Sequence, residues 1–218
     1  KTDFIRMIPG KSGHTIIQVD KDGQNCILLF GGANRSITKE FVDEVLSHFE
    51  KGDILLLQNE VNLLDYIIDK AYEAGMMIIL NPSPYNSALD TCDFHKVSMF
   101  LLNEIEGGQV TGETETEKIL EKLKELYPET KVVLTLGGDG SVYQYKEEQY
   151  RQGIYKVKAV DTTAAGDTFT GYFISSVIEG MPVQEGLSLA AKASAIAVSR
   201  EGATASIPHR EEVLKAEF

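Results

Sequence analysis

Short apolar runs alternate with longer helical stretches along most of this chain of 218 residues, and this alternation constrains its fold more than any other feature. The apolar runs have the length of strands and are bounded by Gly, Pro or polar residues, which predicts strands at 53–58, 76–80, 97–102, 131–136, 141–146 and 154–159. Amphipathic spacing predicts helices at 38–50, 63–74, 113–127, 168–179, 183–200 and 210–215. Such alternation predicts an α/β fold with a mostly parallel sheet, helices on both faces, and ligands at the carboxyl ends of the strands.

The first part of the chain departs from this pattern. Residues 14–20 and 26–31 have the composition of two strands, and the polar, glycine-containing segment 21–25 between them predicts a turn. A β-hairpin is therefore expected before the α/β region. Thr38 is the expected cap of the first helix.

Charge and composition narrow the possible partners. The net charge of -12, the pI near 4.8 and the lack of a basic run in the sequence argue against a surface for nucleic acid or for an anionic membrane. Small metabolites are the expected partners. No apolar run approaches the roughly 18 residues of a membrane span, and the first residues form no signal peptide, so a cytoplasmic location is expected. Cys26 and Cys92 indicate neither a disulfide framework nor a zinc site.

Residues 161–173 carry the strongest chemical signal. Ala164, Ala165 and Gly166 lie where a helix begins, and backbone N–H groups there lack intrahelical partners and favour an anion. Asp167 follows directly. A carboxylate beside such an anion pocket can accept the proton of an attacking hydroxyl during phosphoryl transfer. From these residues alone, an ordinary helix start, in which Asp167 only complements the helix dipole, is an equal alternative.

The flanking residues strengthen the chemical interpretation. Thr163-Ala164-Ala165-Gly166-Asp167 resembles the C-terminal signature of the PfkB-type family of carbohydrate kinases, in its ribokinase group. Further matches follow the order of that family along essentially the whole chain: Gln58-Asn59-Glu60, Asn81-Pro82-Ser83-Pro84, Asn103-Glu104-Ile105-Glu106, Thr135-Leu136-Gly137-Gly138-Asp139-Gly140 and Gly202-Ala203-Thr204-Ala205-Ser206-Ile207-Pro208. The resemblance implies an ATP-dependent sugar kinase, with D-ribose as the first expected acceptor. Another sugar or a nucleoside, as in a fructokinase-like enzyme, is the alternative within the family.

The resemblance also gives the hairpin a role. In this family the hairpin belongs to a small β lid over the sugar and lies in the middle of the sequence, which implies that a further amino-terminal segment precedes Lys1 in the complete protein. Residues 1–32 are then expected to form part of the lid, and 33–218 the kinase domain. Lid strands can pair across a two-fold axis, so the resemblance also implies a homodimer through the lid. If the chain lacks half of the sugar site, it could instead be a non-catalytic nucleotide-binding fragment.

The family match assigns the catalytic and substrate residues. Asp167 would be the catalytic base, and Ala164, Ala165 and Gly166 would form the anion hole. Asp167 and Glu60 would contact the sugar. Without the family match, the favoured interpretation of Glu60 is a charge at the start of a helix, where it would complement the helix dipole.

Nucleotide and Mg²⁺ contacts are assigned in the same way. The implied nucleotide-binding residues are Asn103, Thr135, Leu136, Gly137, Gly138, Asp139, Gly140, Gly166 and Ala191. Ala191 departs from the family, which often has His or Asn at this place. Glu106 would keep a hydrated Mg²⁺ nearby. For Asn103 and Glu106 the alternative is a polar loop with a helix cap. Asp139-Gly140 is also a strong hairpin turn signal.

A monovalent cation site rests on the resemblance alone. The family holds K⁺ with backbone carbonyls, an aspartate and a residue beside the anion hole. The matching positions are Asp161, Thr163, Ala197, Arg200, Gly202 and Ser206. ATP, Mg²⁺ and K⁺ are therefore the expected cofactors.

Competing nucleotide and hydrolase motifs are absent from the sequence. No Gly-x-x-x-x-Gly-Lys-Ser/Thr occurs, and no Gly-x-Gly-x-x-Gly opens a βαβ unit, so neither a P-loop kinase nor a dinucleotide-binding protein is indicated. A Gly-x-Ser-x-Gly elbow is absent as well.

Overall fold

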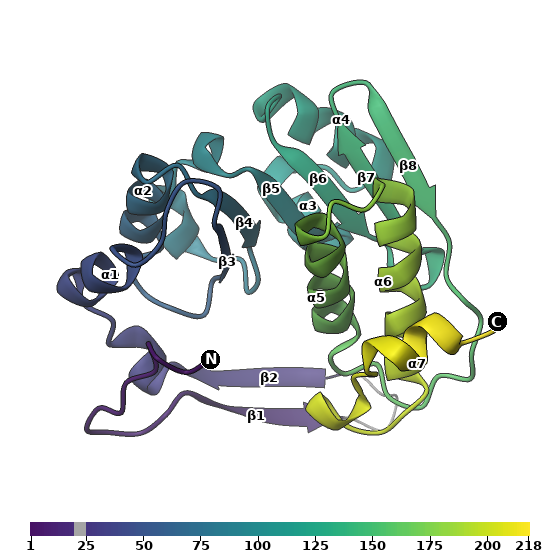
Figure 1. Cartoon of the computed structure of the whole chain (residues 1–218), viewed down its shortest axis with the longest axis horizontal. Helices are drawn as coiled ribbons and strands as arrows, with labels where there is room; N and C mark the ends of the chain where they lie inside the picture. Colours follow the sequence, from purple (N-terminus) through teal and green to yellow (C-terminus); the bar gives the residue numbers. More distant parts are fainter. Residues whose placement is uncertain (20–24) are drawn as a thin grey trace. The chain divides into compact units, whose positions relative to one another are not determined.

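The computed structural model describes residues 1–19 and 25–218 (Figure 1). The chain divides into two compact units, Lys1–Met99 and Phe100–Phe218. The boundary expected at residue 32, between lid and kinase domain, stays a prediction.

The first unit begins with the predicted hairpin. Strands β1 (His14–Val19) and β2 (Asn25–Phe30) pair antiparallel, with His14 opposite Phe30. Residues 21–24 of the predicted turn lie outside the described residues. The hairpin exposes large apolar side chains, Ile16 at 57% and Leu28 at 55% among them.

The rest of this unit alternates helices and strands. In chain order it contains η1 (Gly32–Arg35), α1 (Lys39–Leu46), β3 (Ile54–Gln58), α2 (Leu64–Glu73), β4 (Met77–Asn81), η2 (Ser87–Thr91) and η3 (Phe94–Lys96). The predicted cap of α1 is confirmed, because the Thr38 Oγ1 accepts the N–H of Phe41 at 3.2 Å. Strands β3 and β4 are parallel.

Strand β5 (Met99–Asn103) begins at the last residue of the first unit. The second unit continues with α3 (Glu104–Thr111), α4 (Thr116–Leu126), β6 (Lys131–Thr135), η4 (Gly137–Asp139), β7 (Ser141–Tyr145), β8 (Glu148–Gln152), α5 (Ala165–Ile178), α6 (Val183–Val198), η5 (Thr204–Ser206) and α7 (Arg210–Lys215). Figure 1 shows α5 and α6 side by side in front of β6 to β8. Among the described residues, no helix combines the length and hydropathy that crossing a membrane requires.

The sheet has the strand order β3-β4-β5-β6-β7-β8. Its inner strands are almost fully buried in their middle: Ile78, Ile79 and Leu80 of β4 and Val133 and Leu134 of β6 are all 0% exposed. Burial of consecutive residues means that both faces of the sheet are covered, as expected for an α/β fold. The predicted α/β class, with a mostly parallel sheet and a small separate β hairpin, is confirmed.

The prediction of a strand at 154–159 is wrong. The last strand is β8, which pairs antiparallel with β7 from Tyr145 opposite Glu148. The chain therefore turns at Lys146 and Glu147, with Lys146 in the left-handed region at φ 52°. Strand β8 has polar side chains on both of its faces, as an edge strand can, so it gave no apolar signal. Residues 154–159 form no strand.

Helix α3 was not predicted. The helix predicted at 113–127 is observed as α4, which is shorter than predicted. Helix α3 contains two glycines, and its Ile105 is 71% exposed. The helix therefore has no amphipathic pattern that the sequence could reveal. It is defined by its beginning, where Asn103 and Glu106 form a capping box.

Two glycine substitutions should change stability in opposite directions. Gly171 lies inside α5, and a Cβ there would meet no atom within 4 Å, so Gly171→Ala should raise the free energy of unfolding by about 0.5–1 kcal/mol. A Cβ at Gly107 of α3 would lie 2.8 Å from Ile119 Cγ2 and 3.1 Å from Leu102 Cδ1. Gly107→Ala should therefore lower the free energy of unfolding by about 1–3 kcal/mol. Urea denaturation measures both changes, and shifts of equal sign would contradict this packing.

Candidate active site

The turn into α5 leaves the backbone N–H of Gly166 available to a ligand. Ala164 precedes the helix in the left-handed region, at φ 59° and ψ 12°, and makes no side-chain cap. The N–H of Ala165 donates to the Thr162 carbonyl at 3.3 Å, and that of Thr168 donates to the Ala164 carbonyl at 2.9 Å. In the described part of the chain, the N–H of Gly166 has no hydrogen-bond partner. A Cβ at Gly166 would meet no atom within 4 Å, so an anion can approach this amide closely.

Asp167 lies in the first turn of α5 with its side chain exposed. The residues that follow it fix the helix in the core: Thr168 is 2% exposed, Phe169 6% and Phe173 1%. The rings of Phe169 and Phe173 stack with centroids 6.3 Å apart. The carboxylate is thus carried by a rigid element, which favours a precise position for a reacting group.

A cavity of about 670 Å³ lies beside this turn, within the second unit. Its volume is in the range of pockets that hold small-molecule ligands. It brings together seven predicted site residues: Thr135, Gly137, Gly138, Gly140, Ala165, Gly166 and Ala191. The predicted residues Leu136, Asp139, Ala164 and Asp167 do not line it. Because a Cβ at Gly137 or Gly138 would meet nothing within 4 Å, the glycine turn presents bare backbone on open space.

The glycine turn is also a hairpin, as Asp139-Gly140 predicted. Strands β6 and β7 pair antiparallel with Thr135 opposite Ser141. Gly140 has φ 95°, and a Cβ there would lie 2.0 Å from the Gln152 carbonyl oxygen, so only glycine fits.

Several lining residues were missed in the sequence. They belong to the start of β7, to the segment 154–159, to the loop before α5, and to the faces of α5 and α6 that meet the cavity: Ser141, Ile154, Tyr155, Lys156, Val157, Ala159, Thr162, Phe169, Ser194, Ala195 and Val198. On α6 the signal was present, since Ala191, Ser194, Ala195 and Val198 follow the helical period, but such a stripe is typical of any packed helix. The hydroxyl of Tyr155 bonds to that of Ser188, which does not line the cavity, at 2.8 Å. Ala191 offers the cavity no polar side-chain atom. The α6 side of the cavity is therefore largely apolar.

Asp161 joins two loops that contain predicted cation ligands. Its Oδ1 accepts the N–H of Thr163 at 2.9 Å, and its Oδ2 accepts the N–H of Gly202 at 3.0 Å. The hydroxyl of Thr163 and then the two backbone N–H groups hold the pKa of Asp161 below its usual 3.8. The bond from the Val160 N–H to the Val198 carbonyl, at 2.8 Å, joins the same two segments.

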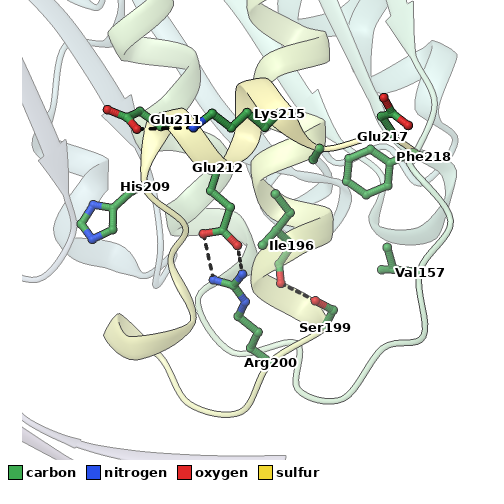
Figure 2. A pocket seen from close by; sticks show the side chains of 11 residues that line it. Val157, Ile196, Ser199, Arg200, His209, Glu211, Glu212, Lys215, Glu217 and Phe218 are labelled. Carbon is green, nitrogen blue, oxygen red and sulfur yellow. Dashed lines mark hydrogen bonds and ion pairs between the residues drawn. The ribbon is translucent and has the colours of Figure 1, made fainter.

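The remaining predicted cation ligands lie in the last turn of α6 and in the chain between α6 and α7. The guanidinium of Arg200 pairs with both carboxylate oxygens of Glu212 on α7, at the rim of a second, open cavity (Figure 2). Arg200 can therefore offer a cation only its carbonyl oxygen. The Ala197 carbonyl accepts the Arg200 N–H at 3.1 Å, and the buried Ser206 hydroxyl donates to the Ala203 carbonyl at 2.7 Å.

Asn103 and Glu106 do not line the cavity and act in the structure as a helix cap. The Asn103 Oδ1 accepts the N–H of Glu106 at 2.9 Å, and the Glu106 Oε2 accepts the N–H of Asn103 at 3.0 Å. Glu106 is only 8% exposed. The capping alternative is thus observed, and the roles in nucleotide and Mg²⁺ binding stay predictions. Across the described ranges 1–19 and 25–218, no three His, Cys, Asp or Glu side chains converge on a metal position.

In the first unit, Glu60 follows β3 in a turn that Asn59 fixes. Asn59 is fully buried, its N–H donates to the Ser83 carbonyl at 2.9 Å, and its Nδ2 donates to the Pro84 carbonyl at 2.6 Å. Two predicted motifs separated in sequence therefore meet here. They define the position of Glu60, whose contact with a sugar stays a prediction.

Comparison with known proteins gives one consistent result. The model of the pfkB family of carbohydrate kinases matches residues 1–210. A ribokinase of Schizosaccharomyces pombe is 34% identical over 226 residues, which is 97% of this chain and 70% of that protein. The crystal structure of a Thermotoga maritima ribokinase superposes with a TM-score of 0.80 and 37% identity, covering 95% of this chain and 70% of that one. Arabidopsis thaliana ribokinase complexed with ribose and ATP gives a TM-score of 0.79 and 30% identity, covering 95% and 69%.

The contacts of Asp161 predict a pH-dependent contribution to stability. A carboxyl group whose pKa is lowered by folding stabilises the fold above its unfolded pKa, and this contribution is lost as the pH falls through the folded value. At neutral pH the wild-type protein should therefore have a higher free energy of unfolding in urea than Asp161→Asn. This difference between the two proteins should narrow once the pH falls below 3.8, the usual pKa of an aspartate. Glu201→Gln, an exposed neighbour in the same loop, is the control. A difference that stays constant on acidification would contradict the role of the Asp161 charge.

Proposed function

The chain belongs to the pfkB family of carbohydrate kinases, and we propose that within this family it is an ATP-dependent ribokinase, which transfers the γ-phosphoryl group of ATP to a primary hydroxyl of D-ribose. One observation carries this proposal: the uncapped turn Ala164 to Asp167 opens α5 beside a ligand-sized cavity, in a chain 34% identical to a ribokinase. Another sugar or nucleoside as acceptor keeps the same chemistry and is the alternative.

Asp167 is proposed as the general base. Its carboxylate accepts the proton of the attacking hydroxyl, which raises the nucleophilicity of the oxygen as the bond to phosphorus forms. The amides at Ala165, Gly166 and Asp167 are proposed to stabilise the negative charge on the transferred group, and Ala164 turns the chain into the helix. Gly166 offers a free N–H, whereas the N–H of Ala165 would exchange its 3.3 Å bond to the Thr162 carbonyl for the ligand. The rigid anchoring of α5 in the core supports this assignment, because preorganised donors lose no energy in reorienting.

The cavity is proposed to hold the nucleotide. The bare backbone of Gly137, Gly138 and Gly140, with Thr135, would lie along the phosphates, since only glycines allow so close an approach. Ala191 and the apolar face of α6 would contact the nucleoside. Leu136 and Asp139 shape the same turn, and Asn103 would contact the nucleotide from the start of α3.

Mg²⁺ and K⁺ are the proposed cofactors. Mg²⁺ usually keeps several waters and binds ATP phosphates with one or two carboxylates, so Glu106 alone fits its requirement. When bound, it neutralises charge that develops on the phosphates. Asp161, Thr163, Ala197, Arg200, Gly202 and Ser206 would hold K⁺. Their oxygen donors suit this ion, with the charge from Asp161 and a carbonyl from Arg200.

Glu60 and Asp167 are proposed to bind the sugar. A carboxylate accepts hydrogen bonds from hydroxyl groups, and the buried Asn59 fixes the backbone beside Glu60. A cytoplasmic location is proposed as well, since ATP is a substrate.

The hairpin is proposed to mediate a homodimer. Ile16, Ile17, Leu28, Leu29 and Phe30 are between 50% and 57% exposed, an unusual density of large apolar side chains on two short strands. Light scattering of the full-length protein should then give twice the mass of one chain. A single-chain mass at all concentrations would contradict the assembly.

The experiment that tests the proposed function measures ADP formation by the full-length protein with ATP and Mg²⁺. The acceptors are ribose, fructose and nucleosides, each with K⁺ and with a tetramethylammonium salt in its place. Selective turnover with ribose that depends on K⁺ is expected. Preference for another acceptor would change the substrate and keep the mechanism, whereas ATP binding without turnover on any acceptor would support a non-catalytic protein.

The role of Asp167 predicts a large and specific loss of turnover. Asp167→Asn should lower kcat by about 10²-fold or more, because the amide cannot accept the proton. Glu185→Gln is the matched control, since Glu185 is the acidic residue in the first turn of α6 and shares only the helix-dipole interaction. Its kcat should stay at the wild-type value. Near-normal turnover of Asp167→Asn would remove Asp167 from the role of base.

A further inference from the structure

We propose that Ser194 is a positioning residue for phosphoryl transfer, because its hydroxyl orients the peptide group that supplies an anion-hole amide at the start of α5. The inference rests on the proposed function and names a residue of α6 that acts through the start of α5. Its basis is one hydrogen bond between the two helices.

The hydroxyl of Ser194 donates to the Ala165 carbonyl oxygen at 3.1 Å. Both residues line the same cavity, and Ser194 is half-buried. Ala165 is the first residue of α5, where no side chain of the helix itself forms a cap. At α1 and α3, by contrast, Thr38 and Asn103 cap the first turn. At α5 the Ser194 hydroxyl, from the neighbouring helix, instead donates to the carbonyl of the first residue, so it holds that peptide group without capping a backbone N–H.

The bonded carbonyl and the proposed anion-hole donor belong to one rigid unit. The C=O of Ala165 and the N–H of Gly166 form a single planar trans peptide, so they point in opposite directions and turn together. A hydrogen bond that holds the oxygen therefore also sets the direction of the N–H. It polarises the peptide as well, which makes the N–H a stronger donor to negative charge. Both effects act where charge develops during transfer.

A purely structural role for Ser194 makes a different prediction. A serine hydroxyl that bonds a helix carbonyl also occurs at Ser176 in α5, whose Oγ donates to the Phe173 carbonyl at 2.7 Å. This second bond lies at the far end of the same helix and is buried. If such bonds served only to stabilise the fold, the loss of either hydroxyl would have the same kind of effect.

The test compares Ser194→Ala with the control Ser176→Ala in the full-length protein. Alanine is a good helix former, so both variants should fold, and circular dichroism melting verifies this. Ser194→Ala should lower kcat about three- to tenfold, the usual effect of losing one such bond, with KM values for ATP and ribose within about twofold of wild type. Ser176→Ala should leave kcat unchanged.

A second measurement separates positioning from stability. Calorimetry compares binding of ADP alone with binding of ADP, aluminium fluoride and ribose together, since aluminium fluoride mimics the transferred phosphoryl group. Ser194→Ala should weaken the second complex by the same three- to tenfold and leave ADP alone unchanged. Wild-type kcat in Ser194→Ala, or equal weakening of both complexes, would overturn the proposal. If the wild-type protein itself shows no turnover, the proposed function fails instead, and that result is distinct.

Discussion

The described site depends on a helix that begins without a side-chain cap. Ala164 adopts a left-handed conformation that turns the chain into α5 and leaves the Gly166 N–H pointing outward. A free amide at a helix end costs stability unless water or a ligand binds it. The surrounding structure keeps the turn in place nonetheless: α5 is buried behind it, α6 bonds to its first carbonyl, and Asp161 fixes the loop before it.

Much of the architecture followed from hydrophobic periodicity. The hairpin strands, the cap at Thr38 and the limits of α7 were predicted, since each depends on neighbours in the sequence. Strand β8 and helix α3 were not. Strand β8 is defined by its pairing with β7, and its own residues are polar, while α3 is specified by two capping side chains rather than by an apolar face. Information of this kind lies in tertiary pairing and in single hydrogen bonds, which a periodic pattern does not record.

The candidate site likewise contains features that the sequence predicted and features that it did not. Small residues before an apolar helix indicated the turn Ala164 to Asp167, and the glycine-rich segment 135–140 indicated a backbone surface; the structure places both beside one cavity. The segment 154–159 lines that cavity and was mistaken for a strand, because apolar residues are common to both. The bond of Asp161 to Gly202 spans 41 residues, and that of Ser194 to Ala165 spans 29, so neither has a local signal.

The capping box at α3 links two properties that are usually separate. Asn103 and Glu106 satisfy each other's backbone N–H groups, and the same two side chains are the ones proposed to face nucleotide and metal. A substitution at either residue would fray the helix and change the ligand chemistry at once. The stability of α3 and the proposed ligand contacts are therefore coupled through this one pair of side chains.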